Sequence, residues 1–460
     1  MKSCPTMPQP ARTPARTAND PTPPWGLKQP GQRDYDCQMN AFEDLKWRGA
    51  VYDSTAGAEK LLADEKVTVY CGFDPTASSL HIGNLVPIMG LVRLQQHGHN
   101  PIVLVGGGTG MIGDPRANDE RPLMPVEQIE ANVAAVREQL GTFLDFDSRT
   151  NPARLVNNAE WLLEVSAIDF LRDVGKHFSV NRMLARESVR SRLDREDGIS
   201  YTEFSYMLLQ ALDYLKLHDE YGCTLQIGGS DQWGNLIAGV DLIRRVNGAE
   251  VQALVYPLIT NASGEKFGKS IGGAPTLDPE QTSPYRLYQF FFNAEDAEVI
   301  SYLKFFTLLD QDEIAGLEQA VADDPRGREA QRTLAREVIR MVHGQDALDG
   351  AERASEVLFG GEIEGVGADQ LMDIFADVPS SELNRADLEG DGVSISRLLA
   401  DTGTAKSAGE ARRLIEQGGV YLNNERVTDH TAPVTLRSAI DGRVLVLRRG
   451  SRNYHLVTII

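Results

Sequence analysis

The order of apolar and polar positions predicts a strand, a helix and a second strand between residues 67 and 105. Val67 to Tyr70 form a β-branched and aromatic run, which is typical of a buried strand. From 85 to 92, apolar residues recur at i, i+3, i+4 and i+7, the spacing of one helix face. Pro101 to Val105 are apolar throughout and too few for a helix, so they predict a buried parallel strand. A βαβ unit of this kind binds its ligands at the carboxyl ends of the strands.

A second helix, predicted over 202–217, carries three polar side chains on one face. Tyr206, Gln210 and Asp213 fall at i, i+4 and i+7. Such a stripe is usually a solvated surface, but most neighbouring positions of this helix are apolar, which predicts burial. Because buried polar groups need hydrogen-bond partners, a polar ligand pocket is the interpretation that we favour.

Further strands are predicted from Leu225 and over 255–260, and a compact helical region follows from 283 to about 354. Near the end of the chain, Ser407 and Glu410 predict a capping box at the start of another helix. Three strands follow that helix, over 420–423, 443–448 and 454–460. The pattern as a whole therefore predicts an α/β part, a helical part and a small α+β part.

Charge is distributed unevenly along the 460 residues. The chain is 42% apolar and 24% charged, as in soluble globular proteins, and its formal net charge of -20 argues at first against a nucleic-acid partner. Residues 391–460, however, carry a net charge of +3, which leaves -23 for residues 1–390. Within this tail, Arg412 and Arg413 lie on the capped helix, with three more arginines at 448, 449 and 452, and they suit contacts with phosphate.

The sequence lacks several signals that would indicate a membrane location, secretion or metal binding. No apolar run approaches the length of a membrane span and no secretory signal precedes the first helix, so we expect a cytoplasmic protein without membrane contact. The four cysteines are widely spaced, which predicts neither a disulfide framework nor a metal site. Residues 1–38 contain eight prolines and predict a disordered extension, and a targeting peptide is the alternative. Met39 is a candidate start site.

Two glycine-rich loops resemble nucleotide motifs only in part. Gly108, Gly110 and Gly113 satisfy G-x-G-x-x-G after a strand, but Asp114 and Pro115 follow at once and prevent the long helix that a dinucleotide site needs. The stretch 261–270 resembles a P-loop that is one residue short, and a solvated basic hairpin is its alternative.

The segment His81-Ile-Gly-Asn84 lies between the first predicted strand and the helix that follows it. Free N–H groups and the positive dipole end of a helix start suit a phosphate, Gly83 allows close approach, and His81 and Asn84 add donors. The alternative is an ordinary helix cap. Cys71 lies at the end of the predicted strand, next to this candidate site. The alternative interpretation is that Cys71 is a small core residue.

Three segments occur in a diagnostic order: His-Ile-Gly-Asn at 81–84, Gly-Gly-Ser-Asp-Gln at 228–232 and Lys-Phe-Gly-Lys-Ser at 266–270. From about Met39 to Ile460 the chain resembles the class I aminoacyl-tRNA synthetases with their HIGH and KMSKS signatures, and most closely the bacterial tyrosyl-tRNA synthetases. Asn84 replaces the final His of the first signature, and Phe267-Gly268 replace Met-Ser. Asn118 stands near the usual place of a Lys, so loop 116–121 departs from the pattern of the family.

The resemblance implies a role for each matching position. The tyrosine-binding residues would be Tyr70 and Asp213 for the phenolic hydroxyl, Asp114, Tyr206 and Gln210 for the ammonium group, and Gln232 near the carboxylate. The ATP-binding residues would be Cys71, Gly72, Asp74, Gly83, Gly229, Asp231 and Lys269. The catalytic residues, which would clamp the β and γ phosphates, would be His81, Asn84, Lys266, Lys269 and Ser270. Arg412 and Arg413 would contact RNA.

The resemblance also implies the reaction. L-tyrosine and ATP would form tyrosyl-adenylate and pyrophosphate, and tyrosine would then pass to the 3′-terminal adenosine of tyrosine tRNA. Mg²⁺ would arrive with the nucleotide rather than on a protein-held site, and the enzyme would be a homodimer. A tryptophanyl enzyme of the same architecture, which would not need Tyr70 and Asp213, is one alternative. An RNA-binding protein on a retired synthetase scaffold is another.

Five segments follow from the pattern and the resemblance together. They are a disordered extension (1–38), a Rossmann-like α/β catalytic domain with a parallel sheet (39–283), an α-helical tRNA-binding domain (284–358), a linker (359–391) and a C-terminal α+β RNA-binding domain (392–460).

Overall fold

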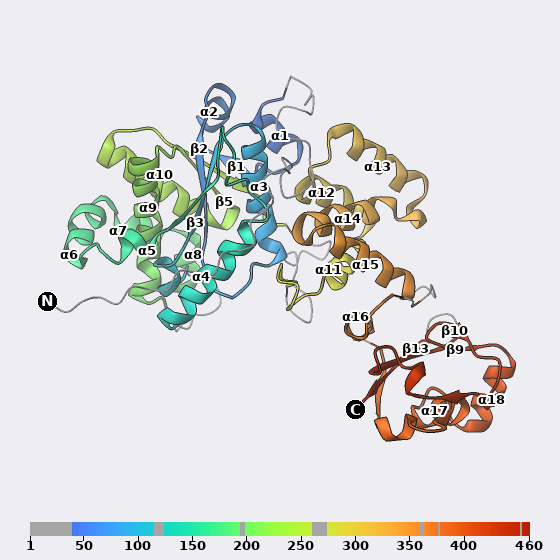
Figure 1. Ribbon diagram of the computed structural model, residues 1–460. Coiled ribbons are helices and arrows are strands. Elements are labelled where there is room, and N and C mark those ends of the chain that lie inside the picture. The colour runs from blue at the N-terminus through green and yellow to red at the C-terminus, as the bar shows by residue number, and fades with distance from the viewer. Residues whose placement is uncertain are drawn as a thin grey trace.

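The computed structural model of this protein describes residues 39–114, 124–193, 198–259, 274–358, 363, 365–375, 378–450 and 453–460. An α/β part, a helical part and a small α+β part follow one another along the chain (Figure 1). The predicted fold class is therefore confirmed. The predicted extension 1–38, loop 116–121, Lys266, Lys269, Ser270 and Arg452 lie outside the described residues.

The α/β part is built on a six-stranded sheet with the order β1-β6-β5-β2-β3-β4. All neighbouring pairs are parallel except β1 with β6. From β2 the chain continues outward through β3 and β4, and then returns to the other side of β2 as β5. The strands are β1 (Asp53–Ser54), β2 (Thr68–Phe73), β3 (Asn100–Val105), β4 (Arg154–Asn157), β5 (Leu225–Gly229) and β6 (Gln252–Tyr256).

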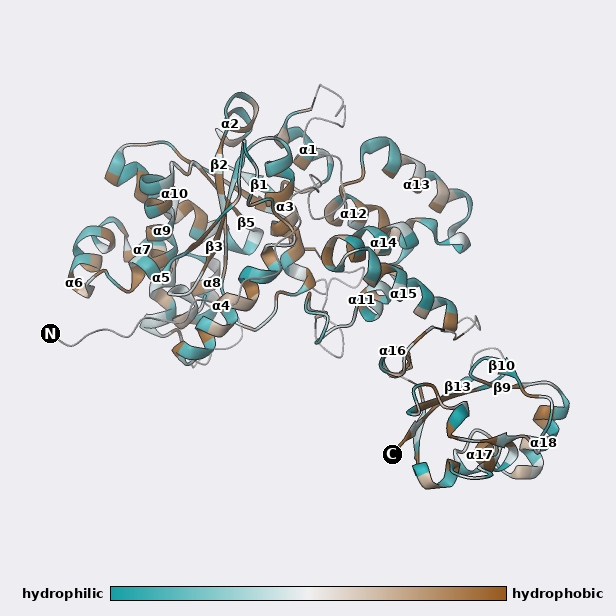
Figure 2. Ribbon diagram, viewed as in Figure 1, coloured by the Kyte–Doolittle hydropathy of each residue, from teal (hydrophilic) through white to brown (hydrophobic). Residues whose placement is uncertain are grey.

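Helices cover both faces of this sheet, and the alternation of side chains along the strands explains why. Val69 and Cys71 belong to one buried cluster with α3, whereas Tyr70 between them belongs to a second cluster with α9. Hydrophobic residues line the strands and the inward faces of the helices (Figure 2). The helices are α1 (Ala41–Trp47), α2 (Ala58–Asp64), α3 (Leu85–Gln96), α4 (Val126–Leu140), α5 (Ala159–Leu162), α6 (Ala167–Asp169), α7 (Val180–Leu184), α8 (Glu187–Leu193), α9 (Tyr201–Tyr221) and α10 (Trp233–Asn247).

The helical part packs an aromatic interior, in which Phe291 and Phe306 are fully buried with ring centroids 5.7 Å apart. Its first helix begins with Ser283, whose hydroxyl accepts from the Arg286 N–H, followed by Pro at the first helical position. The helices are α11 (Pro284–Phe292), α12 (Asp296–Phe306), α13 (Gln311–Asp323), α14 (Glu329–His343) and α15 (Gln345–Leu358).

The C-terminal part contains a five-stranded sheet with the order β10-β9-β12-β13-β7. The Ser407 hydroxyl accepts from the Glu410 N–H and caps the start of α18, as predicted. The predicted capping box is incomplete, because the Glu410 carboxylate accepts from the Lys406 N–H at 2.7 Å and not from Ser407. The elements are α16 (Ala368–Ile374), β7 (Ser380–Leu383), β8 (Val393–Ser394), α17 (Ile395–Asp401), α18 (Ala408–Glu416), β9 (Val420–Leu422), β10 (Glu425–Arg426), β11 (Pro433–Val434), β12 (Val444–Arg449) and β13 (Asn453–Ile459).

Two predicted bounds differ from the structure. The segment 359–391, predicted as a linker, contains α16 and β7, and β7 pairs with β13 in the C-terminal sheet. This pairing joins residues more than seventy positions apart, so a local pattern could not indicate it. The strand predicted over 255–260 is β6, which begins earlier, at Gln252, and ends at Tyr256.

Candidate active site

The carboxyl ends of β2 and β5 face the same edge of the sheet, at the point where the chain reverses its direction across the sheet. Parallel α/β sheets bind ligands at such a switch point, because the loops that follow the two strands diverge there. The loop after β2 carries Asp74 and His81, and the loop after β5 carries Asp231 and Gln232. The topology therefore brings two of the predicted motifs to one edge.

Asp213 on α9 is the centre of a buried polar cluster beneath this edge. It is only 2% exposed, and its two carboxylate oxygens accept from Trp161 Nε1 at 2.8 Å and Asn158 Nδ2 at 2.9 Å. Burial raises the pKa of Asp213 to about 7, although the hydrogen bonds from Asn158 and Trp161 oppose this rise. The carboxyl group of Asp213 therefore titrates near neutral pH.

The cluster continues from Asn158 to Asp74 through a chain of hydrogen bonds. Asn158 Nδ2 donates to Thr109 Oγ1 at 2.9 Å, and the Thr109 hydroxyl donates to Asp74 at 2.8 Å. The Tyr206 hydroxyl donates to the other oxygen of Asp74 at 2.7 Å. A Cβ on Gly106 would lie 2.1 Å from Asp74, so only glycine leaves room for this carboxylate. Tyr206 and Asp213, which both lie on α9, are thus linked through the side chains of Asp74, Thr109 and Asn158.

Tyr70 on β2 points into the same side of the sheet as α9. It is 1% exposed, and its hydroxyl has no hydrogen-bond partner among the described residues. Burial and the nearby charge of Asp213 raise the pKa of Tyr70, so the hydroxyl keeps its proton. A buried hydroxyl without a partner is costly, and a ligand hydroxyl would satisfy it.

Cys71, the next residue, faces the opposite side of the sheet. It is 3% exposed and belongs to the cluster of α3. Burial raises the pKa of Cys71 to about 12, so the thiol is not a nucleophile. The buried position of Cys71 agrees with the alternative interpretation, that of a small core residue. The predicted contact between Cys71 and the ATP ribose stays a prediction.

Asp114 and Gln232 meet at the open side of the cluster. Gln232 Nε2 donates to Asp114 Oδ2 at 2.8 Å, and Asn235 Nδ2 contacts Asp114 Oδ1 at 3.2 Å and Gln232 Oε1 at 3.0 Å. Gln210 is half-buried on α9, and Asp231 is exposed beside Gly229. Asp114 and Gln232 are therefore hydrogen-bonded to each other. The resemblance assigns Asp114 to the ammonium group of the tyrosine substrate and Gln232 to its carboxylate.

His81 and Asn84 form a reciprocal cap on the short helix η1 (Ile82–Asn84). His81 Nδ1 accepts from the Gly83 N–H at 3.0 Å, and Asn84 Oδ1 accepts from the His81 N–H at 3.0 Å. The ring therefore carries its proton on Nε2, and desolvation lowers the pKa of His81. A Cβ on Gly83 would lie 2.8 Å from this ring, so any larger residue there would displace the ring. His81 therefore caps η1 through Nδ1, and this leaves its Nε2–H available as a hydrogen-bond donor.

Residues 274–277 pair with the segment that contains His81. The Ile82 N–H donates to Pro275 O at 3.0 Å, the Leu277 N–H donates to Leu80 O at 2.8 Å, and His81 forms a bridge with Thr276. The chain between β6 and Pro275 includes the predicted Lys266, Lys269 and Ser270. These three side chains lie outside the described residues, but the segment that follows them is anchored directly beside His81.

Arg412 and Arg413 are exposed on α18, as a phosphate contact requires. Arg412 pairs with Glu416 at 2.8 Å, and Arg413 Nε donates to Gly409 O at 3.3 Å. Arg448, which the sequence groups with them, is only 8% exposed and stacks 3.8 Å from the ring centroid of Tyr421. The expectation for Arg448 is wrong, because its guanidinium is packed within the C-terminal sheet.

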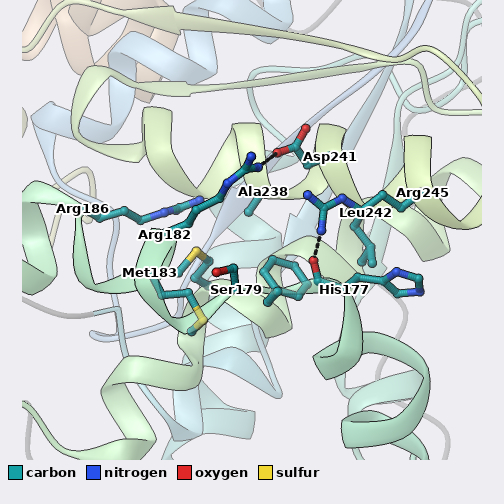
Figure 3. Close-up of a pocket in the computed structure, with 11 residues that line it drawn as sticks. His177, Ser179, Arg182, Met183, Arg186, Ala238, Asp241, Leu242 and Arg245 are labelled. Carbon is teal, nitrogen blue, oxygen red and sulfur yellow. Dashed lines mark hydrogen bonds and ion pairs between the residues drawn. The ribbon is translucent and has the colours of Figure 1, made fainter.

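A pocket elsewhere in the α/β part lies between α7 and α10 (Figure 3). Arg182 approaches Asp241 at 3.9 Å, and Arg245 donates to the carbonyl of His177. None of the residues predicted for tyrosine or ATP is among the described residues that line this pocket.

Asn158, Trp161 and Thr109 are site residues that the sequence reasoning missed. A signal for the first of them exists: Leu155 and Val156 form a short apolar run, and Asn157 and Asn158 follow it, as polar residues follow β2. Among the described residues there is no group of three or more His, Cys, Asp or Glu that could hold a metal ion. The described helices include none that is long and apolar enough to cross a membrane.

Comparison with known families gives two matches that together span most of the chain. Residues 62–360 match the family "tRNA synthetases class I (W and Y)", and residues 370–457 match the "Tyrosine--tRNA ligase SYY-like C-terminal domain". The second match begins in α16, in agreement with the pairing of β7 in the C-terminal sheet.

Individual relatives cover nearly the whole described chain. The tyrosine–tRNA ligase of Roseiflexus castenholzii is 55% identical over 91% of this chain and 99% of its own length. The enzyme of Geobacillus stearothermophilus is 50% identical over 91% of this chain and 99% of its own. Among solved structures, a C-terminally truncated mitochondrial tyrosyl-tRNA synthetase from Aspergillus nidulans superimposes with a TM-score of 0.64 at 30% identity, over 72% of this chain and 95% of its own.

Proposed function

The chain belongs to the tyrosine–tRNA ligases of the class I tRNA synthetase family, and from this premise we propose how its residues divide the work of the reaction. The enzyme joins tyrosine to its tRNA and uses ATP. The first step is attack of the tyrosine carboxylate on the α-phosphorus of ATP, which releases pyrophosphate. In the second step the 3′-terminal ribose of the tRNA takes the tyrosyl group.

Recognition of the phenol is assigned to Tyr70 and Asp213. The observation that supports this assignment is the buried Tyr70 hydroxyl, which has no partner among the described residues and lies near the Asp213 carboxylate. Each Asp213 oxygen already accepts one hydrogen bond, and a carboxylate oxygen can accept another. A substrate hydroxyl would donate to Asp213 and accept from Tyr70, whereas phenylalanine would leave both groups unpaired.

The remaining substrate groups follow outward from the phenol. Tyr206, Gln210 and Asp114 would hold the ammonium group, and Gln232, already bonded to Asp114, would lie near the carboxylate. Gly72 and Gly229, near the carboxyl ends of β2 and β5, and Asp74 and Asp231, which come just after these strands, would meet the nucleotide. Cys71 is the least accessible of the set. In this arrangement the reacting carboxylate lies between the buried cluster and the loop of His81.

Stabilisation of the departing pyrophosphate is assigned to His81 and Asn84 with Lys266, Lys269 and Ser270. Charge builds on the pyrophosphate in the transition state, so donors fixed at that place lower the barrier without tighter binding of the substrate. His81 keeps Nε2–H as a donor because its Nδ1 accepts from Gly83. The segment that follows these three residues in the chain is anchored beside His81, where the Ile82 N–H donates to Pro275 O.

Mg²⁺ is proposed to arrive with ATP. The side chains nearest the phosphate site, His81 and Asn84, offer N–H donors, and the Asn84 oxygen is occupied by the His81 N–H. This donor set fits phosphate oxygens, so the ion would take its ligands from the phosphates and water. Bound there, Mg²⁺ would offset the negative charge of the phosphates.

RNA binding is assigned to the helical part and to a C-terminal module that begins near α16. Arg412 and Arg413 are its exposed cations on α18. Because β7 pairs with β13, a chain that stops at Glu389 would keep a strand without its sheet, and a stop after Leu358 is the cleaner truncation. The truncated chain should make tyrosyl-adenylate and fail to charge tRNA.

A homodimer is proposed through an apolar face between α5 and the start of α9. Seven of the twelve large apolar side chains that are exposed among the described residues fall in residues 163–201, and Ile168 and Tyr201 are each 71% exposed. A concentration of this kind marks an interaction surface. Light scattering of an Ile168→Asp, Tyr201→Asp double variant tests this proposal, which predicts a monomer. Tyr52→Asp is the control, because Tyr52 is 67% exposed and lies outside residues 163–201.

The experiment that tests the assignment as a whole is amino-acid-dependent exchange of pyrophosphate into ATP, run with each of the twenty amino acids. Exchange with tyrosine alone is the expected result. Exchange with tryptophan would support the alternative specificity, and no exchange with any amino acid would support the retired scaffold.

A further inference from the structure

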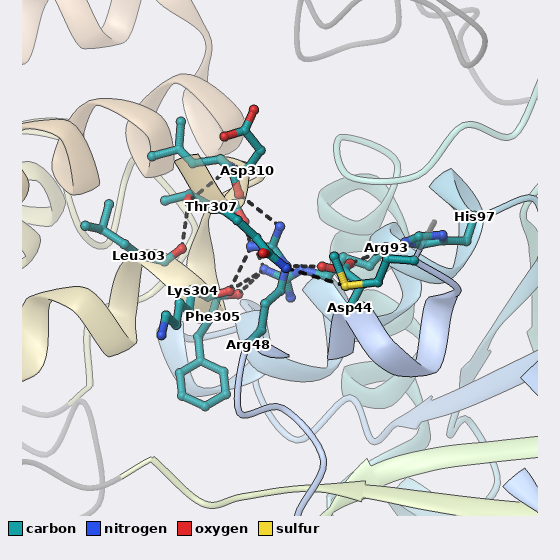
Figure 4. Close-up of polar contacts among 12 residues, drawn as sticks. Asp44, Arg48, Arg93, His97, Leu303, Lys304, Phe305, Thr307 and Asp310 are labelled. Atoms are coloured by element: carbon teal, nitrogen blue, oxygen red, sulfur yellow. Dashed lines mark hydrogen bonds and ion pairs between the residues drawn. The ribbon is translucent and has the colours of Figure 1, made fainter. Parts of the chain in front are cut away.

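The guanidinium groups of two buried arginines of the α/β part contact one turn of the helical part (Figure 4). Arg48 follows the last residue of α1, and Arg93 lies in the last turn of α3. Their exposed fractions are 7% and 2%. Both guanidinium groups reach the backbone at the end of α12, so the contact crosses from one part of the molecule to the other.

The contact consists of six hydrogen bonds to backbone carbonyls. Arg93 Nη2 donates to the carbonyls of Lys304 at 2.9 Å, Phe305 at 2.7 Å and Thr307 at 2.9 Å. Arg48 donates to the carbonyls of Lys304 at 3.2 Å, Thr307 at 3.3 Å and Leu309 at 2.9 Å. Two of the acceptors are therefore shared by both arginines.

The end of α12 favours cations for a general reason. The last carbonyls of a helix lack partners within the helix and carry the negative end of its dipole. Arg48 is itself fixed by Asp44, which accepts from its Nε at 2.8 Å and contacts His97 at 3.4 Å through its other oxygen. Burial opposes ionisation of Asp44, but the bond from His97 and the charges of Arg48 and Arg93 lower its pKa to about 2. Asp44 is therefore ionised at neutral pH and pairs with the Arg48 guanidinium.

One helix connects this cluster to the phosphate end of the candidate active site. The His81 turn and η1 precede α3 directly, and Arg93 lies nine residues after Asn84 on the same helix. At a rise of 1.5 Å per residue, about 14 Å of helix separates the two positions. A rotation of the helical part about its junction would therefore move it relative to the site without any change within α3.

We propose that Arg48 and Arg93 are positioning residues for the transfer step, because they fix the helical part, and the tRNA held by it, relative to α3. This inference rests on the proposed function, in which the RNA is bound on one side of the junction and tyrosine and ATP on the other. Adenylate formation uses groups on one side only. Transfer needs a ribose hydroxyl of a distant tRNA to meet the adenylate, and displacements of about 1 Å slow such reactions by about 100-fold.

The test compares Arg93→Met and Arg48→Met with Arg328→Met in the full-length enzyme. Arg328 makes the same kind of contact within the helical part, where its Nη2 donates to the carbonyls of Phe292 at 2.7 Å and Ala294 at 3.1 Å. Tyrosine-dependent pyrophosphate exchange reports the first step. Single-turnover transfer from the isolated enzyme–adenylate complex to saturating tRNA reports the second, and filter binding reports tRNA affinity.

The two junction variants should exchange pyrophosphate within about twofold of the wild-type rate and transfer tyrosine at least about tenfold more slowly, with tRNA affinity within about twofold. Arg328→Met should leave both rates unchanged. Equal losses in both steps, normal transfer by both junction variants, or a selective transfer defect in Arg328→Met would overturn the proposal.

Arg93→Lys supplies the measurement if a methionine variant does not fold. It keeps the charge but not the planar fork that spans several carbonyls, so its transfer should be slower and its exchange normal. A wild-type enzyme that exchanges no pyrophosphate would refute the proposed function instead, and a wild-type enzyme that exchanges but does not charge tRNA would refute only the assignment of the second step.

Discussion

The two ends of the candidate active site are built in opposite ways. At the phenol end, Tyr70 and Asp213 are 1% and 2% exposed, and the hydrogen bonds around Asp213 join side chains from distant parts of the chain. At the phosphate end, His81 is exposed on a short loop and is held by local contacts with Gly83 and Asn84. One end is a preformed interior, and the other is an open edge of the sheet.

This difference matches what each end has to do. Discrimination between a phenol and a phenyl ring depends on the cost of unpaired polar groups, which is large only in a buried place. Stabilisation of a leaving pyrophosphate requires hydrogen-bond donors in a site that the large, charged nucleotide can enter and leave. In the proposed assignment, the buried end selects the substrate and the accessible end stabilises the charge of the leaving pyrophosphate.

The largest expected effect lies at the phosphate end. His81→Ala and Lys269→Ala should each lower the rate of pyrophosphate exchange by about 100- to 1000-fold, because each removes a donor that acts on transition-state charge. The dissociation constant for tyrosine should stay within about twofold, since both residues are assigned to the phosphates and not to the amino acid. His430→Ala in the C-terminal part is the control. A comparable loss of tyrosine affinity would show that the two ends are not separate.

At the phenol end, Tyr70→Phe should change specificity and stability in opposite directions. Loss of the hydroxyl should reduce the preference for tyrosine over phenylalanine by roughly 5- to 150-fold, the equivalent of about 1–3 kcal/mol for an unpaired group. The free enzyme should become more stable by about 1 kcal/mol, because the hydroxyl lacks a partner among the described residues. Urea unfolding and exchange with both amino acids measure these effects. Lower stability with unchanged specificity would assign the hydroxyl a structural role.

The pH dependence of binding should also distinguish the ends. The pKa of Asp213 is raised to about 7, so the carboxyl is mostly protonated at about pH 6 and ionised at about pH 8. Only the ionised form has full capacity to accept from a phenol, so tyrosine affinity should increase by about tenfold over this range. Phenylalanine affinity should lack this increase. Equilibrium dialysis of both amino acids provides the measurement, and Tyr70→Phe, which keeps the carboxyl, should retain the dependence.

The smallest expected effect concerns a second exposed region, the helix α18. Replacement of both Arg412 and Arg413 by Ala should weaken tRNA binding by several-fold and reduce the slope of log affinity against log salt by roughly one to two units. Arg397→Ala is the matched control, because Arg397 pairs with Asp401 as Arg412 pairs with Glu416. An unchanged slope in the double variant would remove α18 from the RNA-binding surface.

Several errors of the sequence reasoning have a common cause. The strand β7 was hidden in a stretch that reads as a linker, because its partner β13 lies near the end of the chain. Arg448 reads as a surface cation, but it lies against Tyr421 of the neighbouring strand β9. Trp161 has no motif of its own, and Asn158 is marked only by the short apolar run before it. Only the folded sheet brings the two residues to Asp213. In each case the deciding contact joins residues far apart in sequence.

Local patterns along the chain were sufficient for the elements that they predict. The apolar run before His81, the i, i+4, i+7 spacing of Tyr206, Gln210 and Asp213, and the order of the three signature segments were enough for the fold class and the family. The neighbours of these residues, by contrast, depend on how distant segments pack in the folded molecule. Tyr70 and Cys71 are adjacent in the chain, yet the pleat of β2 sends one toward α9 and the other toward α3. Whether a strand residue meets a substrate or a core therefore depends on what packs against each face of the sheet, and distant segments supply that packing.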